Sequence, residues 1–292
     1  MADDGPQWKR ALLEGAVVVG VDVAKKKHWA RVTDRLGQDL ARPFAFHNNR
    51  DGFWRLVRKI GETLRASGAR RAVVGMEATG HYGKPLQYFL RHLGPDWDVV
   101  VVLVNPMHVK RQKELLDNSP TKSDPKDTAV IAKLVRDGHF LHCLVPEGLY
   151  ATLRELTVTR QHQRQQLNGA LARLQGWLDM YFPEFPSVFK DVTGQAAAWV
   201  LSHYPTPTDV RAVPLETLTE GLQQASHKRV GAKRAAGLKA AAEASVGIPE
   251  GLAGARLRLQ GLLEEVTFWK GQLDRTEAAM ARALQQTPYA RF

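Results

Sequence analysis

The sequence predicts an α/β domain built on one mixed sheet, followed by an all-helical region. Short apolar runs rich in β-branched residues alternate with segments of helical spacing in the first half of the chain. After Pro146 only helical spacing remains. With 292 residues, of which 44% are hydrophobic and 24% charged, the chain is long enough for two folded bodies. We expect them at residues 1–145 and 146–292.

Five segments of the first half have the composition of strands. They are residues 17–23, 28–33, 44–46, 72–76 and 99–104. The first three follow one another closely, as in a meander, whereas helical segments separate the later ones. This order predicts one mixed sheet with helices packed on its faces.

Helical signals lie between and after these strands. Residues 51–67 have helical spacing, with Asp51 as the expected N-cap. A second helix is expected through Leu86, Phe89, Leu90 and Leu93, and residues 105–120 form a basic, partly helical stretch. Asp124 followed by Pro125 is typical of a helix start, and this helix should run to about Arg136, with Gly138 ending it.

Two long helices with a heptad pattern dominate the second half. The first seam is Leu149, Leu153, Leu156, Arg160, Gln163, Leu167, Ala170, Leu174, Trp177 and Tyr181. The second is Leu259, Leu262, Val266, Trp269, Leu273, Thr276, Met280 and Ala283. The pattern predicts an antiparallel pair or a dimerising coiled coil, and an ordinary helical bundle is equally compatible with it.

The net charge of +11 and the pI near 9.8 favour a polyanionic partner, most simply nucleic acid. The excess is +8 in residues 1–146 and +3 in the remainder. A basic surface that only maintains solubility is the alternative. The candidate contacts are Lys25, Lys26, Lys27, Lys110, Arg111, Lys113, Lys122, Lys126, Lys228, Arg229, Lys233 and Arg234, the last four expected on one short helical piece.

Several classes of protein are disfavoured by what the sequence lacks. Cys143 is the only cysteine, which excludes a disulfide framework and a zinc ribbon within this sequence. The acidic start is unlike a signal peptide, and no apolar segment approaches the length of a membrane span. No phosphate-binding GxxxxGK[ST] loop is present. We therefore expect a cytoplasmic or nucleoid-associated protein that does not use ATP.

Four carboxylates in the first half carry the strongest chemical signal. Asp22 interrupts one apolar strand and Glu77 ends another, while Asp124 and Asp127 lie three apart at a helix start. A carboxylate at the end of a buried strand is costly unless a cation neutralises it. Mg²⁺ prefers oxygen ligands. Many nucleases use two metal ions about 4 Å apart to bind the attacking and leaving oxygens of a phosphodiester. We therefore predict a metal-dependent phosphodiester site.

Each carboxylate also has a simpler interpretation. Asp22 alone is compatible with capping the turn into Lys25, and a glutamate leaving a strand is common. Asp124 and Asp127 favour the helix macrodipole wherever they occur in a first turn. Their spacing nevertheless places both on one helical face.

The combined pattern resembles a known family. The motifs are residues 19–28, with Asp22; residues 77–82, with Glu77; residues 104–106; and residues 122–127, with Asp124 and Asp127. In order, spacing and flanking residues they resemble the DEDD transposases of bacterial insertion sequences, which are similar to the Piv invertases and are guided by a bridge RNA. The resemblance covers about residues 17–136, and helical heptads follow it, as in that family.

The resemblance implies an RNase H-like (RuvC-like) catalytic domain in which the four carboxylates bind Mg²⁺ or Mn²⁺, with two ions expected. It also implies that basic surfaces hold DNA and a structured guide RNA, and that protomers form homodimers or larger homo-oligomers through the coiled coil. In the family a serine-bearing domain follows the coiled coil, and this sequence ends about where that domain would begin. We therefore expect this chain alone to bind nucleic acid and metal without completing strand exchange.

Two other functions remain open at this stage. One is a hydrolytic, RuvC-like nuclease for branched DNA, which would use a metal-bound water. The other is a non-catalytic RNA-binding and dimerisation module whose carboxylates only support the fold.

Overall fold

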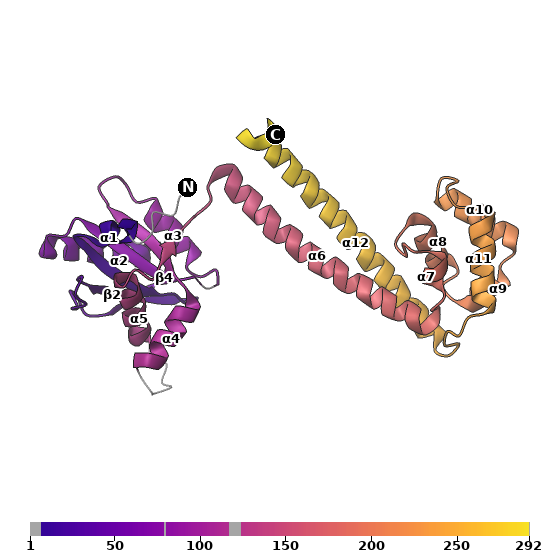
Figure 1. Ribbon diagram of the computed structural model, residues 1–292, viewed down its shortest axis with the longest axis horizontal. Coiled ribbons are helices and arrows are strands. Elements are labelled where there is room, and N and C mark those ends of the chain that lie inside the picture. Colours follow the sequence, from indigo (N-terminus) through magenta and orange to yellow (C-terminus); the bar gives the residue numbers. More distant parts are fainter. Residues whose placement is uncertain (1–6, 79, 117–123, 292) are drawn as a thin grey trace. The chain divides into compact units, whose positions relative to one another are not determined.

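The computed structural model describes residues 7–78, 80–116 and 124–291 of the chain, and it divides into two compact units (Figure 1). The first unit is Met1–Val145 and the second is Pro146–Phe292. Each unit has its own hydrophobic core, and each is considered by itself below.

The first unit is built on a six-stranded mixed sheet with the order β3-β2-β1-β4-β5-β6. Strands β1 to β3 form an antiparallel meander, β1, β4 and β5 run parallel, and β6 returns antiparallel to β5. The strands are β1 (Ala16–Asp22), β2 (Lys27–Thr33), β3 (Phe44–His47), β4 (Arg71–Glu77), β5 (Val99–Val104) and β6 (Leu141–His142). This is the RNase H-like α/β arrangement expected from the sequence.

Helices cover both faces of this sheet. The helices of the first unit are α1 (Gln7–Leu13), α2 (Arg50–Ser67), α3 (Lys84–Arg91), α4 (Pro106–Leu116) and α5 (Asp124–Arg136). Side chains alternate between the faces along each strand. Val17, Val19 and Val21 of β1 belong to the core that includes α2 and α3. Ala16 and Val18 belong to the core that includes α1 and α5.

Three details of the first unit differ from the sequence-based expectations. The N-cap of α2 is Asn49, not Asp51: Asn49 is extended, and its Oδ1 accepts a hydrogen bond from the Gly52 backbone N–H at 2.9 Å. Helix α3 ends at Arg91, before Leu93. Helix α1 and the two-residue strand β6 were not expected from the sequence, because both are short.

The two long helices of the second unit, α6 (Gly148–Tyr181) and α12 (Leu252–Gln285), lie side by side as an antiparallel pair within one chain (Figure 1). Arg160 pairs with Glu277, and Arg173 with Glu265, at 2.7 and 2.6 Å. Of the two arrangements predicted from the heptads, the structure therefore has the intrachain antiparallel pair. Its seam is most deeply buried from Gln163 to Trp177, and the earlier seam positions Leu149, Leu153 and Leu156 are partly exposed.

A group of short helices packs on one end of this pair. They are α7 (Phe185–Val188), α8 (Gln195–His203), α9 (Pro207–Ala212), α10 (Leu215–Ala225) and α11 (Ala232–Glu243), and a 3-10 turn, η1 (Pro288–Arg291), follows α12. Trp177 is completely buried among them and donates its indole N–H to the Ala255 carbonyl at 2.8 Å. No helix in the described part of the chain is long and apolar enough to cross a membrane.

The expected basic helix in this region is wrong in part. Lys228 and Arg229 lie in the turn between α10 and α11, where Lys228 has a positive φ of 62°. Only Lys233 and Arg234 are on α11. The Arg234 guanidinium donates to the Val188 carbonyl and lies over the Phe189 ring, so it also anchors α11 to α7.

Candidate functional site

Asp22 and Glu77 end neighbouring parallel strands at the same level of the sheet. The register of β1 and β4 pairs Gly20 with Gly75 and Val21 with Met76. One further step along both strands brings Asp22 opposite Glu77. Both side chains are half-buried. The carboxyl ends of parallel strands are a common location for ligand sites in α/β sheets, and both carboxylates lie at such ends.

Both carboxylates belong to the sheet face that α5 covers. Val18, Gly20 and Asp22 are two residues apart along β1, so they belong to the same face of the strand. Val18 packs in the core that includes α5. Val73, Gly75 and Glu77 are likewise two residues apart along β4 and belong to one face of that strand. Val73 lies in the same core as Val18. Asp22 and Glu77 therefore belong to the same side of the sheet.

Two glycines let α5 lie directly against the strands. A Cβ on Gly20 would be 2.2 Å from the Thr128 carbonyl oxygen and 2.7 Å from the Ala132 nitrogen. A Cβ on Gly75 would be 2.3 Å from Cγ2 of Val135. Any larger residue at Gly20 would meet helix backbone, which cannot rotate away as a side chain can.

The direction of α5 determines which of its ends reaches the carboxylates. Thr128 lies over Gly20, while Arg136 lines the same cleft as Val18, nearer the start of β1. The helix therefore runs antiparallel to β1, and its first turn lies toward the strand ends that carry Asp22 and Glu77. Asp127 precedes Thr128 and is part of this first turn.

Asp127 is a buried carboxylate with a cationic partner. It is 6% exposed, and its Oδ1 lies 2.7 Å from Nζ of Lys113 on α4. Lys113, expected as a nucleic-acid contact, thus neutralises a predicted metal ligand in this structure. Asp124 begins α5, but its side chain lies outside the described residues, as does Lys122.

The donor chemistry of Asp22, Glu77 and Asp127 suits a hard divalent cation, because all three side chains are carboxylates. Among the residues whose side chains are described, no three His, Cys, Asp or Glu side chains are close enough together to share a metal ion. Asp22 and Glu77 come from the sheet and Asp127 from the helix, where Lys113 pairs with it.

The turn after Asp22 is held by two residues that the sequence did not single out. His28 is completely buried, and its Nδ1 accepts a hydrogen bond from the Ala24 backbone N–H at 3.0 Å. Asn48 donates to the carbonyls of Lys25 and Tyr82 at 3.3 and 3.4 Å, which joins the turn after β1 to the loop after β4. Burial lowers the pKa of His28 below its ordinary value of 6.5, with partial opposition from the Asn48 side chain.

The predicted basic contacts in the first unit lie on the segments around these carboxylates. Lys25 and Lys26 are exposed in the β1–β2 turn directly after Asp22, and Lys27 begins β2 with its Nζ 5.7 Å from the Trp29 ring centroid. Lys110 and Arg111 are exposed on α4, and Lys126 is exposed on α5. The β1–β2 turn directly follows Asp22, and α4 directly follows β5.

A comparison with protein families gives a match over these residues. A family model described as DEDD_Tnp_IS110, transposase, matches residues 19–183, which include all four acidic positions and the whole of α6. The chain belongs to this DEDD transposase family. A search of curated proteins found no match. The transposase match extends across both units, so the family relationship includes the first long helix as well as the RNase H-like domain.

Proposed function

We propose that this transposase cleaves and transfers DNA strands at a divalent-metal site formed by Asp22, Glu77, Asp124 and Asp127. The observation that carries the proposal is the register of β1 and β4, which brings Asp22 and Glu77 together on the face that α5 covers. The family match over the same residues supports it. Bound Mg²⁺ or Mn²⁺, with two ions expected, would polarise the scissile phosphate and stabilise the leaving oxygen.

The residues of the chain itself have separate roles in this proposal. Asp22 and Glu77 supply oxygens from the rigid sheet, and α5 supplies those of Asp124 and Asp127. Lys113 balances the charge of Asp127 and would move aside, or share that carboxylate, when a metal ion binds. Lys25, Lys26 and Lys27 would hold the DNA backbone beside the site.

We further propose a structured guide RNA as a partner and homo-oligomerisation through the pair α6–α12. The net charge of +11 supports a nucleic-acid partner. The partly exposed seam positions Leu149, Leu153 and Leu156 support contact between protomers, because apolar side chains along a helix favour a second helical surface.

Metal binding is the first test. Mn²⁺ titration of the purified chain, followed by electron paramagnetic resonance, should show bound ions that are lost or weakened in Asp22→Asn and in Asp127→Asn. Asp96→Asn is the matched control, because Asp96 is an exposed carboxylate in the loop before β5. Equal Mn²⁺ binding by wild type and both site variants would contradict the assignment.

Activity is tested separately in cells that carry the native flanking DNA. Asp22→Asn should abolish metal-dependent strand cleavage while the purified variant keeps its affinity for nucleic acid. A single noncoding RNA that copurifies with the chain would support guidance, and random fragments would contradict it. A metal-dependent nick in branched DNA without a covalent protein adduct would favour a hydrolytic nuclease. Full activity of Glu77→Gln would favour a non-catalytic module.

A further inference from the structure

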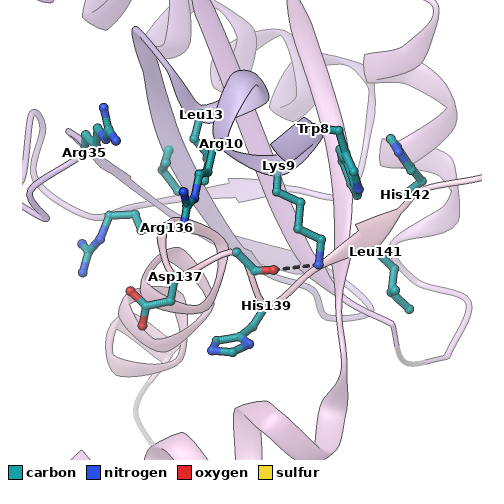
Figure 2. A pocket seen from close by; sticks show the side chains of 12 residues that line it. Trp8, Lys9, Arg10, Leu13, Arg35, Arg136, Asp137, His139, Leu141 and His142 are labelled. Carbon is teal, nitrogen blue, oxygen red and sulfur yellow. Dashed lines mark hydrogen bonds between the residues drawn. The ribbon is translucent and has the colours of Figure 1, made fainter. Parts of the chain in front are cut away.

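A basic cleft is shown in Figure 2. Because Val18 lines it, the cleft lies toward the start of β1, whereas Asp22 ends that strand. Its volume is about 820 Å³. Lining side chains come from α1, the start of β1, the β2–β3 turn, the end of α5 and β6, among them Trp8, Lys9, Arg10, Arg35, Arg136 and His142. None of these residues was expected to bind nucleic acid from the sequence.

The charge of the cleft is strongly positive. Four cations, Lys9, Arg10, Arg35 and Arg136, line it together with one carboxylate, Asp137. That carboxylate is already paired with Lys133 at 2.6 Å. Across the described part of the chain, no carboxylate pairs with Arg10, Arg35 or Arg136. Three guanidinium groups therefore remain for an external anion.

The wall of the cleft is fixed by Lys9 and aromatic rings. The Lys9 ammonium donates to the Gly138 carbonyl at 2.8 Å and lies 5.2 Å from the Phe140 ring centroid, while Trp8 stacks on His142 at 3.9 Å (Figure 2). A helix C-terminus repels anions, and Lys9 neutralises the carbonyl just beyond the end of α5. Because the Gly138 carbonyl already accepts a hydrogen bond from Lys9, it does not compete with an external anion for the arginine side chains.

Size and chemistry together define the ligand. Guanidinium groups bind phosphate oxygens in pairs of hydrogen bonds, which makes arginine the preferred side chain for phosphate esters. A volume of 820 Å³ falls in the range of clefts that hold organic ligands, roughly 300–1,000 Å³, and far exceeds that needed for one inorganic phosphate. Arg10, Arg35 and His139 are exposed, so the cleft is open for a chain to pass.

We propose that this cleft binds the phosphodiester backbone of a nucleic-acid strand, independently of the metal site. Val18 lines the cleft, and Asp22 lies four residues farther along β1, about 13 Å away at the rise of a strand. Both belong to the sheet face covered by α5. The cleft is therefore a second nucleic-acid contact on the same face of the domain, separate from the carboxylates.

The test measures binding of a fluorescent oligonucleotide to the full chain in EDTA, by anisotropy, over a range of salt concentrations. The triple variant Arg10→Gln, Arg35→Gln, Arg136→Gln should lower the slope of log affinity against log salt by roughly 2 to 3, since each phosphate contact contributes about 0.7 to 0.9. Arg58→Gln, which removes an exposed arginine from α2 on the other sheet face, should leave the slope unchanged.

The double variant Arg10→Gln, Arg35→Gln guards against misfolding, because both side chains are exposed whereas Arg136 packs against Gly37. It should lower the slope by about 1 to 2. An unchanged slope in both variants would overturn the proposal. Complete competition by a mononucleotide or by inorganic phosphate, at the affinity of the oligonucleotide, would also overturn it in favour of a small-ligand site. Because EDTA removes divalent metal from this assay, failure of the metal site and failure of the cleft are distinguishable.

Discussion

Gly20 of β1 lies directly beneath the backbone of Thr128, so closely that a Cβ at Gly20 would be 2.2 Å from the Thr128 carbonyl oxygen. This contact sets the distance between α5 and the sheet. It therefore sets the distance between Asp127, on the helix, and Asp22, two residues beyond Gly20 on the strand. The candidate site depends on this packing as much as on the carboxylates themselves.

Gly20→Ala should separate α5 from the sheet. The added methyl meets backbone atoms of Thr128 and Ala132, so we expect a loss of stability of about 1–3 kcal/mol or more. Thermal unfolding and Mn²⁺ affinity should both decline. Gly94→Ala is the matched control, since a Cβ at Gly94 meets nothing within 4 Å. Wild-type Mn²⁺ affinity in Gly20→Ala would show that the helix spacing does not control the site.

Lys113→Gln should destabilise the first unit and increase its response to metal. Removing the ammonium leaves the buried Asp127 carboxylate without its partner, at a cost of about 1.5–3 kcal/mol for a hydrogen bond to a charged group. Mg²⁺ should then raise the melting temperature more in Lys113→Gln than in wild type. Lys110→Gln, an exposed neighbour on α4, is the control. Equal Mg²⁺ shifts in all three proteins would argue against ion binding at Asp127.

The first unit should lose stability on acidification because of His28. Its folded-state pKa lies below 6.5, so the unfolded chain binds a proton first as the pH decreases. The free energy of unfolding therefore decreases as the pH falls from about 6.5 to the folded-state pKa of His28. The loss is about 1.4 kcal/mol for each unit by which the folded-state pKa lies below the unfolded-state pKa. Protonation also removes the acceptor for the Ala24 N–H.

Unfolding of wild type, His28→Leu and His47→Gln between pH 7.5 and 5 tests this assignment. His28→Leu should be less stable at neutral pH and should depend less on pH. His47→Gln, which changes an exposed histidine on β3, should keep the acid dependence of wild type. If the pH profile of His28→Leu matched that of wild type, another group would be responsible.

In the second unit, Trp177 should contribute far more to stability than the ion pairs along α6 and α12. Trp177→Phe leaves the Ala255 carbonyl without its indole donor in a buried core, which costs about 1–3 kcal/mol. Arg173→Gln breaks a partly exposed pair with Glu265, which is worth about 1 kcal/mol or less. Chemical unfolding followed by circular dichroism compares the two, and an equal loss in both would contradict this ranking.

The carboxylate pattern illustrates what the sequence made visible. Asp22 and Glu77 stand out because each ends an apolar run, and local hydrophobic patterns report strand positions well. The family match includes the same positions. His28 and Asn48 did not stand out, because their roles come from contacts with Ala24, Lys25 and Tyr82 that no periodicity reveals.

By itself, the sequence determined five of the six strands, the two long helices and the acidic positions, since these follow from the residue pattern along a short stretch of chain. Only the tertiary structure decided which strands align Asp22 with Glu77, that α6 pairs with α12 of the same chain, and that Arg10, Arg35 and Arg136 share one cleft. The physical reason is the separation in sequence between the residues that decide each feature. Periodicity records which face of an element is buried, whereas register, helix pairing and clefts arise from packing between residues far apart in the sequence.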